Sequence, residues 1–451
     1  MIRQGWIGAT FGALGLAALG LPTAAQTADP HAGHRQHQGA AEDTAPPARS
    51  LFESDMVTMA GMTPRDPMAG HDQPGWQWMG MAIGRLGMND QGGPSGEESF
   101  ESSNWFMGMG HRNLGRGRLT LMTMGSLEPA TVPAAGSPQI FQVGETFQGR
   151  LLVDRQHPHD LFMNVSATYR HPLGADAAWW AQAALLGEPA LGPTAFMHRA
   201  STGENPTAPL SHHWHDSTHI TNSVLTAGAG WKWLAVEASA FHGREPDEQR
   251  WDVDGGRPDS ASARLRLELP DGWSAQISHA FLKNPEALEP GDLRRTTASL
   301  HYGAGGEGPF AASFVWGRNR ESHGTTDAYL LEGAYQLTAS DQLYGRAEQV
   351  KREPALLLSK GFQPELFGHT HATGPVEERQ EVDIQALTLG YVKGLGAFRS
   401  VSAGLGADLT LYRFPDFLRP TYGDTPGSVH VFLRLRWVAG HGRAGHAAHV
   451  P

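Results

Sequence analysis

The sequence predicts an all-β fold: a closed antiparallel transmembrane β-barrel of about 16 strands, in a range of about 14 to 18, with long loops on one side, some of which fold into the lumen. Three observations favour this fold. From Trp76 onward, segments of about 8 to 13 residues alternate apolar and polar side chains. The polar face carries mainly Gly, Ser and Thr, whereas a soluble sandwich normally has dense Lys and Glu there. Short and long connections also alternate along the chain.

The composition of the 451 residues excludes several classes of protein. The chain has no Cys, which rules out thiol nucleophiles, disulfides, thiolate metal sites and a lipid-modified Cys. Its formal net charge of −11 argues against nucleic acid as a partner, because nucleic-acid binding needs a basic surface. Charged residues make up only 18% of the chain and 56 residues are Gly, which is unlike an ordinary soluble enzyme.

Residues 1–25 are predicted to be a cleaved secretory signal peptide. Arg3 precedes an apolar stretch from Trp6 to Leu21, and the small residues Ala24 and Ala25 follow. The alternative is a membrane anchor, which the short, Gly-rich stretch disfavours. The sequence therefore predicts export to the bacterial outer membrane, with a soluble periplasmic β protein as the alternative.

Residues 26–75 are predicted to be a flexible arm rich in His and Met. They show no sustained hydrophobic period, and His31, His34 and His37 recur at three-residue spacing. The second half of the arm contains Met56, Met59, Met62, Met68 and His71.

Sixteen segments are predicted to be strands, and residues 261–269 illustrate the pattern. Leu265 and Leu267 share one face, while Arg264 and Arg266 share the other. The apolar face is expected to meet lipid and the polar face to line the lumen. The predicted strands are 76–88, 99–110, 118–126, 161–170, 177–186, 222–230, 233–241, 261–269, 273–281, 295–302, 310–318, 327–337, 342–350, 383–393, 399–411 and 428–437.

The connections between these strands segregate by length. Short links lie around Trp231 and at 270–272, 338–341 and 393–397. The long connections are 127–160, 187–221, 242–260, 282–294, 352–382 and 412–427. A further strand-like segment, Gln148 to Arg155, would break the even strand count, so we assign it to a loop that folds inward. With that choice all long connections fall at one end of the barrel.

The last predicted strand ends the barrel domain, residues 76–437. Val431, Leu433 and Trp437 share its apolar face. The pattern resembles the closing strand of outer-membrane barrels, which the barrel assembly machinery reads, so this machinery and outer-membrane lipid are expected partners. A His-containing tail, residues 438–451, follows the aromatic position and departs from that pattern.

Histidines and carboxylates concentrate in the first three long loops, which loop parity places at one mouth of the barrel. Neutral imidazole binds Zn, Cu, Ni and Fe, and carboxylates orient the rings. Three interpretations remain open: a hydrogen-bonded plug without metal, a metal site, or a catalytic centre in which a metal activates water with Glu245 as base. No nucleophile elbow, zincin motif or Ser-His-Asp order is recognisable, and no organic cofactor is indicated. The candidate residues are His157, His159, Asp160, His198, His212, His213, His215, Asp216, His219 and His242.

Methionine is distributed unevenly. Of the 14 Met residues, all except the initiator lie between Met56 and Met197. Three pairs at spacing two fall in the first three predicted strands, so each pair shares one face: Met79 and Met81, Met107 and Met109, and Met122 and Met124. Thioether is a soft ligand that suits Cu(I), and an exported chain without Cys would use Met and His for copper. The alternative is that these side chains pack against lipid or an inward loop.

The stretch from about Trp76 to Trp437 resembles a bacterial outer-membrane β-barrel of porin-like size. Residues 55–62 and 66–72, rich in Met and His, resemble the leader of copper-resistance outer-membrane proteins. The segments 157–160, 187–193 and 212–219 are similar to stretches of uncharacterised exported bacterial proteins and imply no activity.

These patterns favour an outer-membrane barrel that binds or passes a metal ion, most plausibly copper, or a small solute, in metal resistance. Met and His of the arm would capture the metal, the Met pairs would relay it, and the loops of His157 and His212 would gate the mouth. The alternatives are a metal-dependent outer-membrane hydrolase and a general porin without metal function.

Overall fold

The computed structural model describes residues 75–288, 291–303, 308–322, 324–359 and 381–440. No helix of these residues is both long and apolar enough to cross a membrane. The predictions for the signal peptide, for most of the arm and for the end of the tail lie outside the described residues, and these include His31, His34, His37, Met56, Met59 and Met62.

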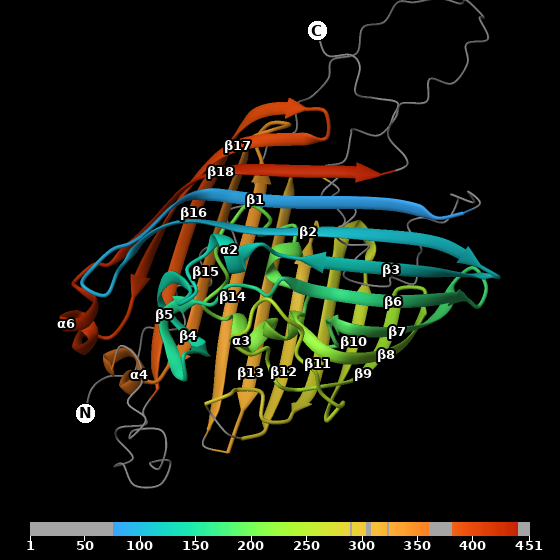
Figure 1. The fold of residues 1–451 in the computed structure, drawn as a ribbon, viewed down its shortest axis with the longest axis horizontal. Coiled ribbons are helices and arrows are strands. Elements are labelled where there is room, and N and C mark those ends of the chain that lie inside the picture. The colour runs from blue at the N-terminus through green and yellow to red at the C-terminus, as the bar shows by residue number, and fades with distance from the viewer. Residues whose placement is uncertain (1–74, 289–290, 304–307, 323, 360–380, 441–451) are drawn as a thin grey trace, which may run out of the picture. The chain divides into compact units, whose positions relative to one another are not determined.

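Sixteen antiparallel strands close into a barrel, as the sequence predicted (Figure 1). Neighbours along the chain pair with one another, β3 pairs with β6, and β1 pairs with β18 to close the ring. The barrel strands are β1 (Gln77–Gln91), β2 (Glu98–Leu114), β3 (Gly117–Gly125), β6 (Phe162–Pro172), β7 (Ala177–Gly187), β8 (Thr221–Trp231), β9 (Leu234–Phe241), β10 (Ser260–Glu268), β11 (Trp273–Leu282), β12 (Leu293–Tyr302), β13 (Phe310–Arg320), β14 (Thr325–Gln336), β15 (Gln342–Arg352), β16 (Val382–Phe398), β17 (Val401–Arg413) and β18 (Gly427–Gly440).

The alternation within the strands sorts side chains between the outside and the lumen. In β18, Leu433 and Leu435 are 37% and 47% exposed on the outer surface. Phe432 and Arg434, which alternate with them, point inward and are buried. A continuous outward row of aliphatic side chains suits lipid hydrocarbon and is poorly solvated by water, which identifies the transmembrane type of barrel.

A charge placed on this outer surface tests its lipid contact. Leu433 lies near the middle of β18, opposite Leu405 of β17 and Leu86 of β1. We expect Leu433→Arg to destabilise the folded barrel in bilayers by about 2–4 kcal/mol, because hydrocarbon does not solvate a guanidinium. Val401→Arg, at the short-turn end of β17, should destabilise the folded barrel by only about 0–1 kcal/mol. Denaturant titration in lipid vesicles measures both, and equal losses at the two positions would contradict the lipid contact.

The extra strand-like segment forms a hairpin apart from the barrel wall. β5 (Arg150–Gln156) pairs with β4 (Ser137–Phe147) in a separate two-stranded sheet. The hairpin is tied to the inner face of the wall, since Arg352 of β15 donates from Nε to the Phe141 carbonyl at 2.8 Å. Phe141 itself is fully buried and its ring stacks on Tyr422, with centroids 4.2 Å apart. The prediction of an inward loop at this segment is therefore confirmed.

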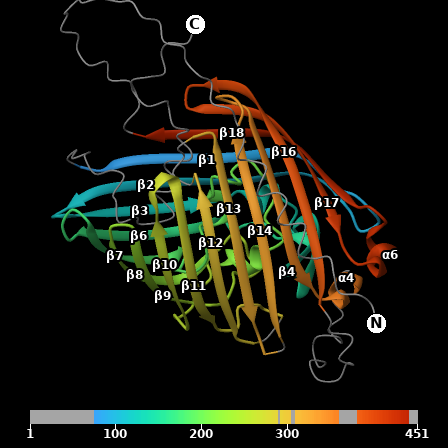
Figure 2. The same cartoon turned by 180° about the vertical axis from the view of Figure 1, so that it is seen from behind.

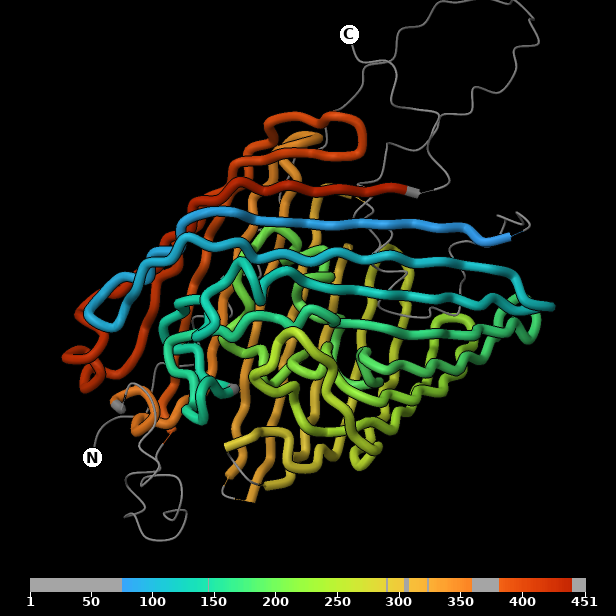
Figure 3. The backbone as a smooth tube through the Cα atoms, viewed as in Figure 1, coloured from blue at the N-terminus to red at the C-terminus, as the bar shows by residue number. Residues whose placement is uncertain are grey.

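The connection between β7 and β8, residues 188–220, fills part of the lumen, and we call it the plug (Figures 1 and 2). Every residue of the plug is buried or half-buried. Figure 3 follows the backbone from β7 through the plug to β8. Its short helices are η1 (Phe196–His198), α3 (His212–His215) and η2 (Ser217–His219). Short helical turns elsewhere are α2 (Glu128–Thr131), η3 (Pro270–Gly272), α4 (Pro354–Ser359), η5 (Asp416–Leu418) and α6 (Arg419–Tyr422).

Candidate metal site in the barrel lumen

The three Met pairs form two cross-strand rows on the inner face of β1, β2 and β3. Direct register partners across the strands lie roughly 4.5–5.5 Å apart at Cβ, so neighbouring thioethers of a row can meet. Met81 is fully buried and Met107 is 5% exposed, which places these rows toward the lumen and away from lipid. The rows are Met79, Met109 and Met122, and Met81, Met107 and Met124; we call them the Met ladder.

The Met ladder borders a cavity of about 80 Å³, which has room for several water molecules. Met197, His198 and His219 of the plug also line the cavity. Glu188 also lines it, and burial raises the pKa of this carboxyl to about 7. The thioethers that line the cavity come from Met107, Met122, Met124, Met163 and Met197. Soft sulfur ligands and imidazoles therefore line the same cavity.

Five of the predicted histidines gather into one cluster, as loop parity suggested. The ring centroids of His159 and His219 lie 5.3 Å apart, and those of His212 and His219 lie 5.2 Å apart. His157 stands 6.2 Å from His159, and His213 stands 5.5 Å from His212. The segment after β5 supplies His157 and His159, whereas the plug supplies the other three. We call these five residues the His cluster.

Three rings of the His cluster are held through Nδ1 by a fixed acceptor. The Nδ1 of His159 lies 2.8 Å from Glu128 Oε2, and that of His212 lies 2.7 Å from Asp216 Oδ1. The Nδ1 of His219 lies 2.9 Å from the Asp216 carbonyl. Because these acceptors carry no proton, each Nδ1–H donates and each Nε2 keeps its lone pair. Metal-binding histidines are typically oriented in this way.

Burial favours the neutral, metal-binding form of His212 and His219. Burial holds the pKa of His219 well below its ordinary value, and the neighbouring His212 and His159 reinforce the effect. Burial also lowers the pKa of His212, although its bond to Asp216 opposes this. The His219 Nε2 is buried and has no hydrogen-bond partner among the described residues. The neutral imidazoles of His212 and His219 therefore lie next to each other at neutral pH.

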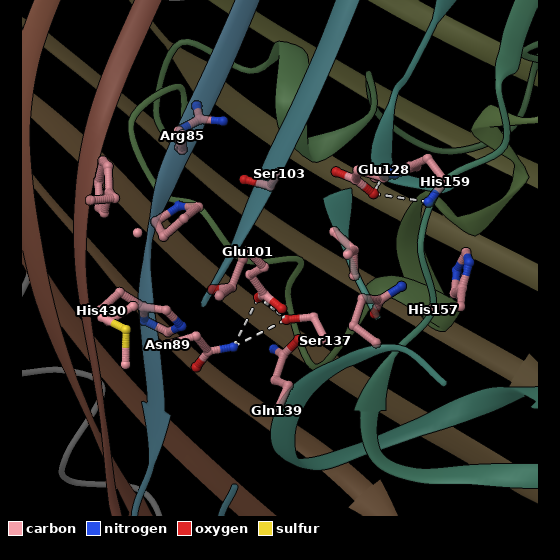
Figure 4. Close-up of a pocket in the computed structure, with 17 residues that line it drawn as sticks. Arg85, Asn89, Glu101, Ser103, Glu128, Ser137, Gln139, His157, His159 and His430 are labelled. Carbon is pink, nitrogen blue, oxygen red and sulfur yellow. Dashed lines mark hydrogen bonds and ion pairs between the residues drawn. The ribbon is translucent and has the colours of Figure 1, made fainter. Parts of the chain in front are cut away.

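A second cavity, of about 60 Å³, lies between the His cluster and the wall formed by β1, β2 and β18 (Figure 4). His157 and His159 face it from the loop, and Glu128, which is hydrogen-bonded to His159, lines it as well. Asn89 and Glu101 face it from the wall and are joined by a hydrogen bond of 3.1 Å. Members of the His cluster thus line both cavities, since His157 and His159 border this one and His219 borders the cavity at the Met ladder.

The other predicted site residues have separate environments. His198 is packed edge-on against Trp105, with centroids 4.9 Å apart, and burial lowers its pKa to about 4. His215 lies against the carbonyl of Ala328, and burial lowers its pKa to about 4 as well. His242 lies 3.2 Å from Asp259, outside the cluster.

Two predicted carboxylate ligands are engaged by arginines. Asp160 pairs with Arg250 at 3.2 Å, and Asp216 pairs with Arg199 at 2.5 Å. Although burial alone would raise the pKa of Asp216, Arg199 and the bond from His212 hold it well below its ordinary value. Both carboxylates therefore anchor loops, and a hydrolase that uses them as metal ligands is not supported by this arrangement.

Only two groups of three His, Asp or Glu side chains among the described residues bring their ligand atoms within 4.8 Å of one another. One is His213, Glu245 and Glu286, and the other is the exposed group Asp247, Asp252 and Asp254. No three of His157, His159, His212 and His219 bring their ring nitrogens within 4.8 Å of one another. Glu245, predicted as a catalytic base, lies beside His213.

The plug is fastened to the wall by ion pairs that the sequence pattern did not reveal. Arg199 donates to Glu332 of β14 at 2.5 Å as well as to Asp216. Glu204 accepts from Arg434 and Arg436 of β18 at 2.5 and 2.9 Å. Each pair between the plug and the wall joins residues that are more than 130 positions apart in the chain. The inward position of each wall residue was predictable, but its partner was not.

Comparison with known proteins gives the fold. An anion-selective porin from Comamonas acidovorans superimposes with a TM-score of 0.51 at 11% identity, covering 81% of this chain and 100% of that porin. Salmonella typhi OmpF in complex with daunomycin gives a TM-score of 0.47 at 10% identity, covering 80% of this chain and 97% of OmpF. Pseudomonas putida OprB gives 0.45 at 10% identity, covering 81% of this chain and 94% of OprB. No family model and no curated protein matches. The porin-like barrel fold is shown, whereas the solute is not.

Proposed function

We propose that the chain is a plugged outer-membrane barrel that binds a soft metal ion, most plausibly Cu(I), at the Met ladder and hands it to or from the His cluster. The observation that carries this proposal is the cavity that five Met residues and two His residues line together. Thioether and neutral imidazole are the two Cu(I) ligands available to a chain without Cys.

The outer-membrane location is part of the same proposal. The outward aliphatic rows and the porin-like fold support it. The predicted signal peptide of residues 1–25 would deliver the chain to the barrel assembly machinery. The Met and His residues of the arm, residues 26–75, would capture the metal before it reaches the lumen, as their resemblance to copper-resistance proteins implies.

Packing is the competing explanation of the Met ladder, because several of its members also contact the plug. Met81, Met107 and Met124 belong to one apolar cluster with Phe196 and Met197 of the plug. Packing requires a side chain of suitable volume, whereas metal binding requires sulfur. Leu replaces Met with little change of volume, typically at a cost under about 1.5 kcal/mol, and it removes the ligand.

The test is Ag⁺ binding, since Ag⁺ mimics Cu(I) without redox chemistry. We expect the purified barrel to bind Ag⁺ in calorimetry, and Met107→Leu/Met124→Leu to weaken binding by at least about tenfold. Met88→Leu is the matched control, because Met88 lies on β1 but is 44% exposed on the outer surface. Failure of the parent to bind Ag⁺ would refute the proposal. Unchanged binding by the double variant would assign the Met ladder to packing.

A further inference from the structure

His213, Glu245 and Glu286 meet where three loops come together. The Nδ1 of His213 lies 3.7 Å from Glu245 Oε1 and 3.7 Å from Glu286 Oε1. The plug supplies His213, the connection between β9 and β10 supplies Glu245, and the connection between β11 and β12 supplies Glu286. These three connections are long ones, so the group lies toward the long-loop end of the barrel.

The imidazole of this group is buried and held in one orientation. His213 is 8% exposed, and its Nδ1 is buried without a hydrogen-bond partner among the described residues. The opposite edge of the ring lies against Gly144 of the β4–β5 hairpin, where a Cβ would stand 2.2 Å from His213 Nε2. Gly144 has φ +145°, which disfavours any other residue there. The backbone therefore blocks the Nε2 edge, and Nδ1 faces the two carboxylates.

The distances exceed those of hydrogen bonds but suit ligands around an ion. A nitrogen and an oxygen at 3.7 Å do not form a hydrogen bond. Zinc ligands of these types lie about 2.0–2.2 Å from the ion, and two of them at a tetrahedral angle are about 3.3–3.6 Å apart. The group is thus close to the spacing of three ligands that surround one cation.

The charges also favour a cation. Two carboxylates face one imidazole, and Arg295 of β12 interacts with both of them as well as with Glu321 and Asp216. The Arg295 guanidinium is already bonded to Asn319 at 3.0 Å and Ser217 at 2.8 Å. The second oxygen of Glu245 is buried without a hydrogen-bond partner among the described residues.

We propose that His213, Glu245 and Glu286 form a binding site for a divalent cation of the Zn²⁺ type. One nitrogen and two carboxylate oxygens suit a borderline divalent ion and lack the sulfur that Cu(I) prefers. The site is separate from the Met ladder but shares His213 with the His cluster, so the experiments below are chosen to distinguish it from the function proposed above. A bound ion would link the plug to two other loops and stabilise the plugged state by mass action.

Calorimetry with Zn²⁺ alone on the metal-stripped full-length barrel tests the site. We expect one Zn²⁺ per chain, and at least about tenfold weaker binding after Glu245→Gln/Glu286→Gln. Asp247→Asn/Asp252→Asn is the matched control, because it removes two exposed carboxylates next to the same site and should leave Zn²⁺ affinity unchanged. Heat-modifiable gel migration verifies that each variant folds, and His213→Asn gives a second variant if the double change prevents folding.

The outcomes separate this proposal from the previous one. Absence of Zn²⁺ binding by the parent would overturn it. Loss of Zn²⁺ binding in the Asp247/Asp252 variant alone would overturn it as well. Ag⁺ binding should persist in Glu245→Gln/Glu286→Gln, and Zn²⁺ binding should persist in Met107→Leu/Met124→Leu.

Discussion

Replacing Glu204 by Gln is expected to release the plug and open the barrel. Glu204 is 1% exposed and accepts from Arg434 at 2.5 Å and from Arg436 at 2.9 Å. Arg85, which donates to the Gly203 carbonyl at 2.5 Å, adds a third positive charge. Removing the carboxylate leaves buried guanidinium groups without a counter-charge, which costs about 3–5 kcal/mol. Conductance in planar bilayers should rise from nearly closed to persistently open.

The control for this change is Glu97→Gln. Glu97 also pairs with an arginine, Arg155, but its side chain is 57% exposed, so water screens the pair. The conductance of the Glu97→Gln variant should equal that of the parent. Equal conductance of the Glu204 variant and the parent would show that other contacts suffice to hold the plug.

Glu204 also determines how opening of the parent barrel depends on pH. Burial alone would raise the pKa of Glu204, but the charges of Arg436, Arg434 and Arg85 hold it below its ordinary value of 4.5. A carboxyl with a lowered pKa contributes stability that is fully present above its ordinary pKa and is lost as the pH falls through its folded value. The parent should therefore stay closed from pH 7 to about 4.5 and open only in stronger acid. Opening near pH 6 would instead indicate histidine titration.

The fold was predictable because every strand of a transmembrane barrel alternates outward apolar and inward polar side chains. Period-two alternation with small polar residues on one face located all sixteen strands, and Leu265 and Arg264 lie on the predicted sides. Strand ends were less certain, since β16 extends to Phe398 and β18 extends to Gly440. The pattern also could not identify the partner of the segment from Arg150 to Gln156, because alternation is the same in a wall strand and in an internal hairpin.

The candidate site was predictable only in part. Spacing showed that Met107 and Met109 share a face, but the register that places Met107 opposite both Met81 and Met124 depends on strand pairing. Loop parity predicted that the histidines lie at one end of the barrel, but it did not predict which of them contact one another. His242 stays outside the cluster, since it follows Phe241, which points inward at the end of β9, and successive residues alternate.

Two chemically different kinds of contact hold the plug in the lumen. The side formed by β1 to β3 presents thioethers and packs against apolar plug residues such as Phe196. On the other strands, buried Arg and Glu side chains such as Glu332 and Arg434 bind plug residues of opposite charge. Ionic contacts are lost when a partner is removed, whereas the apolar contacts tolerate changes of similar volume. Opening is therefore expected to begin at the charged contacts.

Arg199→Ala should disturb both the plug and the His cluster. The side chain of Arg199 lies 2.5 Å from Glu332 and 2.5 Å from Asp216, and all three are buried. Without the guanidinium two carboxylates remain buried and poorly compensated, at a cost of about 3–5 kcal/mol. Asp216 also orients His212 through a bond of 2.7 Å, so the ring should lose its fixed acceptor.

Hydrogen exchange measures the effect of this change on the plug. Amides of residues 188–220 should lose protection in Arg199→Ala, while those of β8 to β15 should keep theirs. In Arg199→Lys the protection of the plug amides should lie between that of the parent and that of Arg199→Ala. An ammonium keeps the positive charge, but it cannot form the forked contact with both carboxylates. Arg318→Ala is the control: Arg318 makes a similar forked contact with Asp327 but is 48% exposed, so its removal should leave the exchange unchanged. If the plug amides of Arg199→Ala exchange as slowly as those of the parent, the ion pairs do not hold the plug, and its apolar contacts with the Met ladder must carry that role.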